Sequence, residues 1–307
     1  MKHHLVQLPG VEIHAVEQGS GPLVLLVHGF PELWYSWRHQ LPALAEAGYR
    51  AVAIDVRGYG RSSAPDDVAA YRMRELVADN AGVVRALGAD TAAIVGHDWG
   101  SPIAANSALL EPDVFTAVAL LGVPYTPRNG MRPTDAFAMA GGDEEFYVSY
   151  FQEPGRAERE IDPDVRGWLR GFVTSNAFTV APGGQLKDRF GDAPVPPWFD
   201  LDAYGAEFER TGLTGALNRY RNVDRDWEDL EALDGAPVPQ PSIYIGGALD
   251  PSTTWLKDAI DAHAHTLPGL VSQHILAGAG HYLPQEVPET VNRLLIDWLR
   301  VAVPGGG

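Results

Sequence analysis

Short apolar runs that alternate with helical patterns constrain the fold of this chain more than any other feature. The run Leu23–Val27 is apolar at every position, as expected of a strand that is buried on both faces. Further strand-like runs lie at 51–54, 91–95, 114–121, 242–245 and 271–275, and stretches of helical spacing lie at 36–47, 71–87, 101–110, 254–264 and 288–301. This alternation predicts an α/β fold with a mostly parallel sheet that is flanked by helices.

The alternation is interrupted between about Pro124 and Pro239. This stretch is rich in Pro, Gly, Trp, Tyr and Phe and contains no clear buried strand. A chain of 307 residues is long enough for one large α/β domain with an insertion. We therefore expect a core made of residues 1–124 and 240–307, with residues 125–239 inserted as a mainly helical lid.

Composition argues against several classes of partner and chemistry. The chain carries 23 Lys and Arg against 40 Asp and Glu, a formal net charge of −17, which argues against nucleic acid and anionic membrane as partners. The absence of cysteine excludes disulfides and thiol catalysis. The start lacks the apolar run of a signal peptide, and no apolar segment approaches the roughly 20 residues that cross a bilayer. We expect a soluble cytoplasmic protein, and whether it forms a homodimer stays open.

The segment Gly96-His97-Asp98-Trp99-Gly100 follows the predicted strand 91–95 and has the pattern of a nucleophile elbow, with an aspartate where a serine would be expected. The carboxylate of an aspartate is ionised at neutral pH, and its attack on a saturated carbon that bears a leaving group gives an ester that water can cleave. Asp98 therefore indicates an epoxide or an alkyl halide as the electrophile. The alternative is an ordinary aspartate that caps a helix N-terminus.

A second loop can supply hydrogen-bond donors to the same site. The segment His28–Pro31 follows the predicted strand 23–27, so it lies with Asp98 at the carboxyl edge of the sheet. A tight loop there can direct a backbone N–H at a developing oxyanion, and the residue after the nucleophile supplies the other donor. We expect the N–H groups of Phe30 and Trp99 to form this oxyanion hole.

A histidine and an acid follow later strands. His281 follows the predicted strand 271–275, and histidine is the usual base for activating water near pH 7. Asp250 follows the strand 242–245, which gives the chain order nucleophile, acid, histidine. We expect Asp250 to orient the His281 ring, with Asp258 and Asp261 as alternatives.

Two further histidines are candidates for a metal site. His263 and His265 do not share a face of their predicted helix, so we interpret them as surface residues rather than metal ligands.

Together these segments resemble the epoxide hydrolases of the α/β-hydrolase fold, of the soluble type. The resemblance spans nearly the whole chain and rests on residues 28–37, 55–62, 96–100, 150–155, 217–222 and 280–282. It implies the α/β-hydrolase fold and two lid tyrosines that donate hydrogen bonds to the epoxide oxygen, here Tyr150 and Tyr220. We also expect an apolar substrate pocket that is lined by Phe30, Pro31, Trp34 and Trp99.

The resemblance implies hydrolysis of organic epoxides to vicinal diols through an alkyl ester on Asp98. The expected catalytic residues are Asp98, His281, Asp250, Tyr150 and Tyr220. The expected partners are a small apolar epoxide and water, and neither a metal nor an organic cofactor is expected.

Two alternatives stay open. The core motifs are shared with haloalkane dehalogenases, which would use the same nucleophile on an alkyl halide. A non-catalytic protein of this fold would bind a small molecule in the same pocket without converting it.

Overall fold

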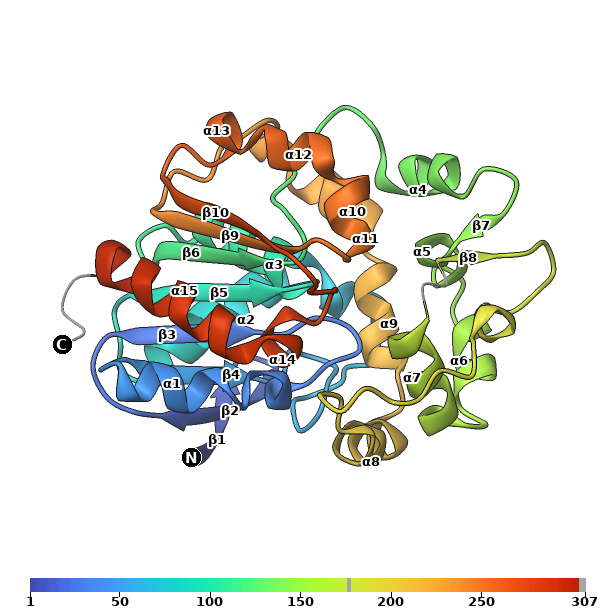
Figure 1. Cartoon of the computed structure of the whole chain (residues 1–307), viewed down its shortest axis with the longest axis horizontal. Helices are drawn as coiled ribbons and strands as arrows, with labels where there is room; N and C mark the ends of the chain where they lie inside the picture. The colour runs from blue at the N-terminus through green and yellow to red at the C-terminus, as the bar shows by residue number, and fades with distance from the viewer. Residues whose placement is uncertain (176–177, 304–307) are drawn as a thin grey trace.

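The computed structural model describes residues 1–175 and 178–303. Within these residues the main sheet consists of β1 (Lys2–Leu8), β2 (Val11–Gln18), β3 (Leu23–Val27), β4 (Arg50–Ile54), β5 (Ala92–His97), β6 (Phe115–Leu121), β9 (Ser242–Gly247) and β10 (Leu270–Leu276). The eight strands lie in the order β1-β2-β4-β3-β5-β6-β9-β10 (Figure 1). β1 pairs with β2, and β2 with β4, in antiparallel fashion, whereas the other neighbours are parallel. The predicted α/β fold with a mostly parallel sheet is confirmed.

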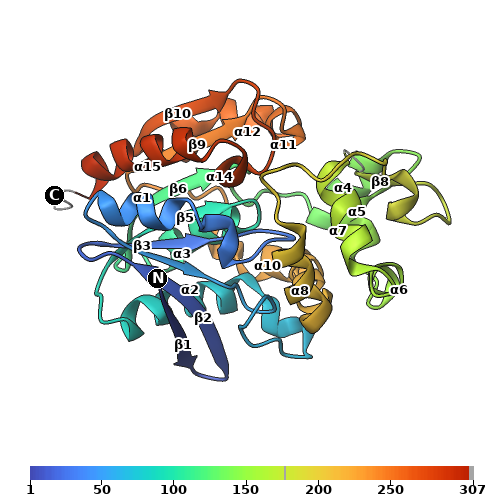
Figure 2. The ribbon, with the colours of Figure 1, turned by 60° about the horizontal axis from the view of Figure 1, so that its bottom comes forward.

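Helices cover both faces of this sheet (Figures 1 and 2). One face carries α1 (Gln40–Glu46) and α15 (Pro288–Ala302), and the other carries α2 (Met73–Ala86) and α3 (Gly100–Leu110). Because successive side chains of a strand point to opposite faces, Ile94 of β5 packs with α2 and α3, whereas Val95 packs with α1 and α15. Each face therefore has its own apolar core.

The antiparallel strands β1 and β2 are not predicted by the apolar pattern. β1 lies at the edge of the sheet and mixes polar and apolar residues in the sequence KHHLVQL. In β2 the buried residue His14 bonds to Asp55 Oδ2 at 2.7 Å, so a polar side chain occupies a core position. Burial at this edge therefore leaves no continuous apolar run in the sequence.

Residues 125–239, here called the lid segment, lie beside the sheet edge at which the parallel strands end (Figures 1 and 2). The lid segment is mainly helical, with β7 and β8 as a short antiparallel pair. Its elements are α4 (Pro133–Gly141), β7 (Glu145–Phe146), α5 (Tyr147–Tyr150), α6 (Arg156–Ile161), α7 (Val165–Thr174), β8 (Thr179–Val180), α8 (Leu201–Thr211), α9 (Thr214–Tyr220) and α10 (Val223–Asp229).

Some helices are shorter than the sequence pattern predicts, and α14 was not predicted. The stretch predicted as one helix at 254–264 is spanned by α11 (Pro251–Trp255), α12 (Lys257–Asp261) and α13 (His263–Thr266), and α14 (Leu283–Glu286) precedes α15. Four 3₁₀ helices lie at Trp34–Trp37, Val68–Tyr71, Leu186–Arg189 and Glu231–Leu233 in the described part of the chain. In that same part, no helix has the length and apolar character that crossing a membrane requires.

The turn between β5 and α3 is built on close backbone contacts. Asp98 has a φ of 52°, in the left-handed region, where aspartate is tolerated better than most side chains. A Cβ at Gly100 would lie 1.9 Å from the carbonyl oxygen of Val27, so this position needs glycine. The turn thus packs directly against the end of β3.

Replacing Gly100 by alanine should destabilise the protein by about 1–3 kcal/mol or more, because the backbone must move away from Val27. Gly191→Ala is the matched control, since a Cβ at Gly191 meets nothing within 4 Å. Denaturant titration followed by circular dichroism measures the free energy of unfolding. An unchanged free energy for Gly100→Ala would contradict the close packing of this turn.

Candidate active site

Asp98 lies in the turn between β5 and α3, and its side chain contacts the loop that follows β3. Asp98 Oδ1 accepts a hydrogen bond from the Phe30 N–H at 2.7 Å. A Cβ at Gly29 would lie 2.3 Å from Asp98 Oδ1, so glycine is what lets this loop come so close. Trp99, and not Asp98, occupies the N-cap position of α3. The alternative interpretation of Asp98 as a helix cap is therefore wrong.

His281 and Asp250 lie beside Asp98. Asp98 follows β5, Asp250 follows β9 and His281 follows β10. These three strands end at one edge of the sheet. His281 Nε2 is 3.2 Å from Asp98 Oδ2, and His281 Nδ1 is 2.9 Å from Asp250 Oδ2. The alternative acids Asp258 and Asp261 are exposed on α12. The structure thus brings together the three residues predicted from the sequence.

Two carboxylates flank the His281 ring and favour its charged form. Burial alone would lower the pKa of His281, but the carboxylate of Asp250, followed by that of Asp98, raises this pKa well above its ordinary value. In the same way, burial would raise the pKa of Asp250, yet the neighbouring His281 ring lowers it. If the charge on Asp98 is lost, one of the two stabilising carboxylates is removed and His281 becomes easier to deprotonate.

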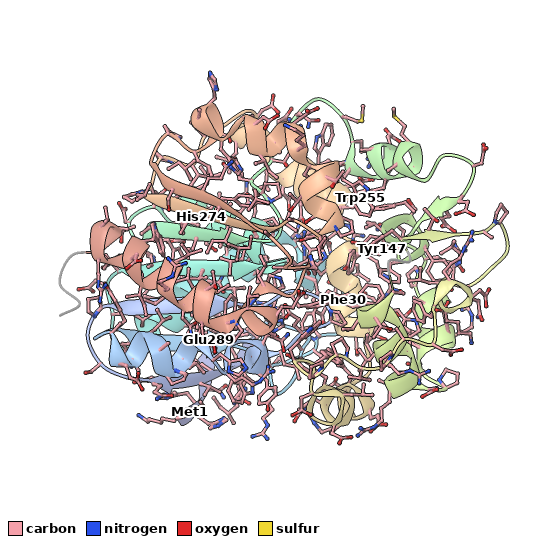
Figure 3. The ribbon with its side chains drawn as sticks, viewed as in Figure 1. Met1, Phe30, Tyr147, Trp255, His274 and Glu289 are labelled. Atoms are coloured by element: carbon pink, nitrogen blue, oxygen red, sulfur yellow. The ribbon has the colours of Figure 1, made fainter. Side chains whose placement is uncertain are left out.

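A cavity of about 1270 Å³ opens over these residues, between the sheet edge and the lid segment. Its lining includes, from the core, Phe30, Asp98, Trp99, Asp250 and His281, and, from the lid segment, Phe146, Tyr147, Phe172, Trp198 and Tyr220. Figure 3 shows Phe30 of the core and Tyr147 of the lid segment, where these two parts meet. An apolar cavity with a few polar groups gathered at one place is typical of small-molecule sites.

The structure corrects the choice of the first lid tyrosine. The Tyr150 hydroxyl donates to Glu160 Oε2 at 2.6 Å, and the Arg156 guanidinium lies 4.1 Å from the centre of the Tyr150 ring. Tyr150 is therefore held inside the lid segment and is not part of the cavity lining. Tyr147, one turn earlier on α5, lines the cavity together with Tyr220, and their ring centres are 6.1 Å apart.

Both cavity tyrosines keep their protons at neutral pH. Burial raises the pKa of Tyr147 and of Tyr220 well above the ordinary value, and the nearby charge of Asp98 raises each further. A hydroxyl that stays protonated can donate a hydrogen bond to a bound oxygen. The sequence offered one signal for Tyr147, namely a second tyrosine three residues before Tyr150, at which the motif begins.

The expected pocket residues divide into two groups. Phe30 and Trp99 line the cavity. Trp34 lies elsewhere, because its ring packs edge-on against His3 with centroids 5.5 Å apart. Pro31 is buried and is not among the residues that line the cavity. The expectation that Trp34 and Pro31 line the pocket is therefore corrected.

Three buried polar side chains that the sequence did not single out lie behind His281. His97 Nε2 donates to the carbonyl oxygen of His281 at 2.8 Å, and His97 Nδ1 lies 2.7 Å from Glu32 Oε2. Gln285 Nε2 donates to Glu32 Oε1 at 3.1 Å. Glu32 follows Pro31 and His97 precedes Asp98, so their place within two site motifs was the available signal.

Glu32 and His97 form a charged pair in the protein interior. Burial would raise the pKa of Glu32, but the His97 ring lowers it to about 2. Burial would likewise lower the pKa of His97, but Glu32 outweighs burial and raises it. A protonated His97 can donate from both ring nitrogens, which fits its two partners.

The histidines near α13 have different surroundings. His263 is only 1% exposed, its Nδ1 lies 2.7 Å from Gln273 Oε1, and its ring packs against Tyr244. The expectation of a surface residue is wrong for His263, whereas His265 is exposed. Among residues 1–175 and 178–303, no group of three or more His, Asp or Glu is placed to hold a metal ion.

Asp250→Asn should lower the pKa of His281 more than Asp98→Asn does, because Asp250 makes the larger favourable contribution to the charged ring. NMR titration of the imidazole nitrogens measures this pKa in each variant. Asp261→Asn removes an exposed acid from α12 and should leave the pKa of His281 unchanged. A larger fall in Asp98→Asn than in Asp250→Asn would contradict the assignment of Asp250 as the main partner.

Known proteins share both the sequence and the architecture of this chain. Residues 22–286 match the family model described as alpha/beta hydrolase fold. Epoxide hydrolase B of Mycobacterium tuberculosis is 40% identical over a match that covers 97% of this chain and 98% of the relative.

Solved structures agree with this match. An epoxide hydrolase from an endophytic Streptomyces is 67% identical, with a TM-score of 0.95, and the match covers 97% of this chain and 95% of that chain. Epoxide Hydrolase A from Mycobacterium thermoresistibile is 44% identical, with a TM-score of 0.92 and coverage of 97% and 98%. This chain therefore belongs to the α/β-hydrolase fold family and, within it, to the epoxide hydrolases.

Proposed function

We propose that this chain hydrolyses organic epoxides to vicinal diols, with residues 125–239 acting as a lid over the site. The observation that carries the proposal is that Asp98, Tyr147 and Tyr220 line one cavity. The names of the relatives support the same reaction for this chain. The apolar lining favours a small apolar epoxide, with water as the second reactant.

The first step is the opening of the epoxide ring. The hydroxyls of Tyr147 and Tyr220 donate hydrogen bonds to the epoxide oxygen, and Asp98 attacks one ring carbon. Asp98 Oδ1 already accepts the Phe30 N–H, so Oδ2 is the oxygen that forms the new bond. The product is an alkyl ester on Asp98, and the alkoxide that forms takes up the proton that His281 carries in the free protein.

The second step is the hydrolysis of this ester. Ester formation removes the charge of Asp98, so the pKa of His281 falls and the neutral ring can take a proton from water. The hydroxide attacks Cγ of Asp98, and Oδ1 becomes the oxyanion beside the Phe30 N–H. The Trp99 N–H is proposed as the second donor. The diol oxygen leaves with the second proton of the attacking water. This restores the Asp98 carboxylate and leaves His281 charged, a state that Asp250 stabilises.

The two cavity tyrosines favour an epoxide over an alkyl halide as substrate. An epoxide oxygen leaves the attacked carbon as an alkoxide, which needs a proton or strong hydrogen bonds, whereas a halide leaves without a proton. The nearby His281 and Asp250 favour an enzyme over a binding protein, because binding alone needs no base. Diol formation from styrene oxide supports the proposal, halide release from a haloalkane would identify a dehalogenase, and the absence of both products would indicate a binding protein.

Tyr147→Phe combined with Tyr220→Phe should lower kcat/KM for styrene oxide about 10³-fold or more, because the alkoxide loses both donors. Tyr150→Phe is the matched control and should stay within about threefold of the natural protein, with a loss of about 1 kcal/mol in stability. Steady-state kinetics and thermal unfolding measure the two quantities. Retained activity in the double variant would remove these tyrosines from the mechanism.

A single turnover with excess enzyme in heavy-oxygen water should give a diol without label. The oxygen added to the substrate comes from Asp98 Oδ2, and the label enters the carboxylate of Asp98. Mass spectrometry of the diol and of the peptide that contains Asp98 locates the label. Heavy oxygen in the first-turnover diol would show direct attack by water and would exclude the ester.

A further inference from the structure

Tyr204 of the lid segment is buried against the core, where its hydroxyl begins a chain of hydrogen bonds. The hydroxyl donates to Gln285 Oε1 at 3.0 Å and lies 2.8 Å from Ser36 Oγ. Its ring stacks on Phe199 with centroids 4.6 Å apart, so the side chain is held in place by packing as well. Tyr204 of the lid helix α8 thus forms a hydrogen bond with Gln285 of α14 in the core.

The side-chain amide of Gln285 links Tyr204 to Glu32, and its hydrogen bonds fix which way the amide faces. Its Oε1 accepts from both Tyr204 and Arg38, at 3.0 and 2.7 Å, which uses both lone pairs of the oxygen. The amide nitrogen must therefore face the other way, where it donates to Glu32 Oε1 at 3.1 Å. The orientation of the Gln285 amide is set partly by the lid.

Glu32 and His97 complete the path to the catalytic loop. Glu32 Oε2 lies 2.7 Å from His97 Nδ1, and His97 Nε2 donates to the His281 carbonyl oxygen at 2.8 Å. Tyr204, Gln285, Glu32 and His97 are each at most 2% exposed, so bulk water cannot replace a lost partner in this path. The path therefore joins α8 to the backbone of the residue proposed to activate water.

We propose that Tyr204 is a positioning residue that holds the His281 ring in the place that ester hydrolysis needs. The inference rests on the proposed function, because it needs the ester on Asp98. Ring opening needs the Asp98 carboxylate and the hydroxyls of the cavity tyrosines, and none of these groups hydrogen-bonds to a side chain of this path. The His281 proton passes to the alkoxide only after the ring has opened. Hydrolysis needs the His281 ring at the right place beside a water molecule, and a small misplacement of a base costs rate. Loss of the Tyr204 hydroxyl therefore slows the second step and spares the first.

Tyr204→Phe keeps the ring that stacks on Phe199 and removes the hydroxyl. When hydrolysis alone is slowed, kcat and KM fall together and kcat/KM is unchanged. We expect kcat and KM each to fall about tenfold, with kcat/KM within about twofold of the natural protein. Rapid quench followed by intact-protein mass spectrometry should show more protein carrying the ester during turnover.

Tyr35→Phe is the matched control. The Tyr35 hydroxyl donates to Asp200 Oδ2 at 3.2 Å, so it also joins the start of α8 to the core, but it lies outside the path. Its kcat and KM should each stay within about twofold of the natural values. A shared loss of kcat in both variants would mean that any weakened lid contact slows turnover, and this result would overturn the proposal.

Gln285→Leu tests the path at a second point and keeps the proposal open to refutation if Tyr204→Phe does not fold. It should show the same joint fall of kcat and KM, and the double variant should be no slower than the slower single variant. Unchanged kinetics, or a fall in kcat/KM equal to that in kcat, would overturn the inference. If the natural protein itself forms no ester on Asp98, the proposed function fails, which is a separate result.

Discussion

A negative charge held inside an apolar cavity is the constraint on which the rest of this structure depends. In the proposed reaction Asp98 must be ionised to attack carbon, but a buried carboxylate is costly unless it is paired and hydrogen-bonded. The Phe30 N–H at 2.7 Å and the His281 ring at 3.2 Å supply these partners. The left-handed turn at Asp98 and the glycines at 29 and 100 follow from the need to bring three strand ends this close.

A group of three charged side chains and a buried pair meet at the loop that carries His281. In the cavity, the His281 ring lies between the carboxylates of Asp98 and Asp250, while its carbonyl oxygen is bonded by His97 of the buried Glu32–His97 pair. A buried ion pair adds little net stability, because desolvation of the charges offsets their attraction. Its effect here is geometric, since His97 holds the backbone of His281 through the carbonyl oxygen.

Two tyrosines of one short lid helix have different surroundings. Tyr147 and Tyr150 lie on α5, yet Tyr147 lines the cavity and Tyr150 bonds to Glu160. Glu160 also accepts the Trp168 indole N–H and the backbone N–H groups of Leu186 and Lys187. A buried carboxylate with four donors organises the lid interior, and this leaves Tyr147 as the residue that can face Asp98.

The sequence by itself determined the α/β fold and the places of Asp98, Asp250 and His281, because parallel strands bring their carboxyl ends to one edge whatever lies between them in the chain. Only the tertiary structure decided which tyrosine of α5 lines the cavity, that Trp34 packs against His3, and that Tyr204 reaches Gln285. These choices depend on how each lid helix and each loop is rotated against its neighbours. A sequence pattern shows which residues share a helix, but the packing of that helix selects the side chain that lines the cavity.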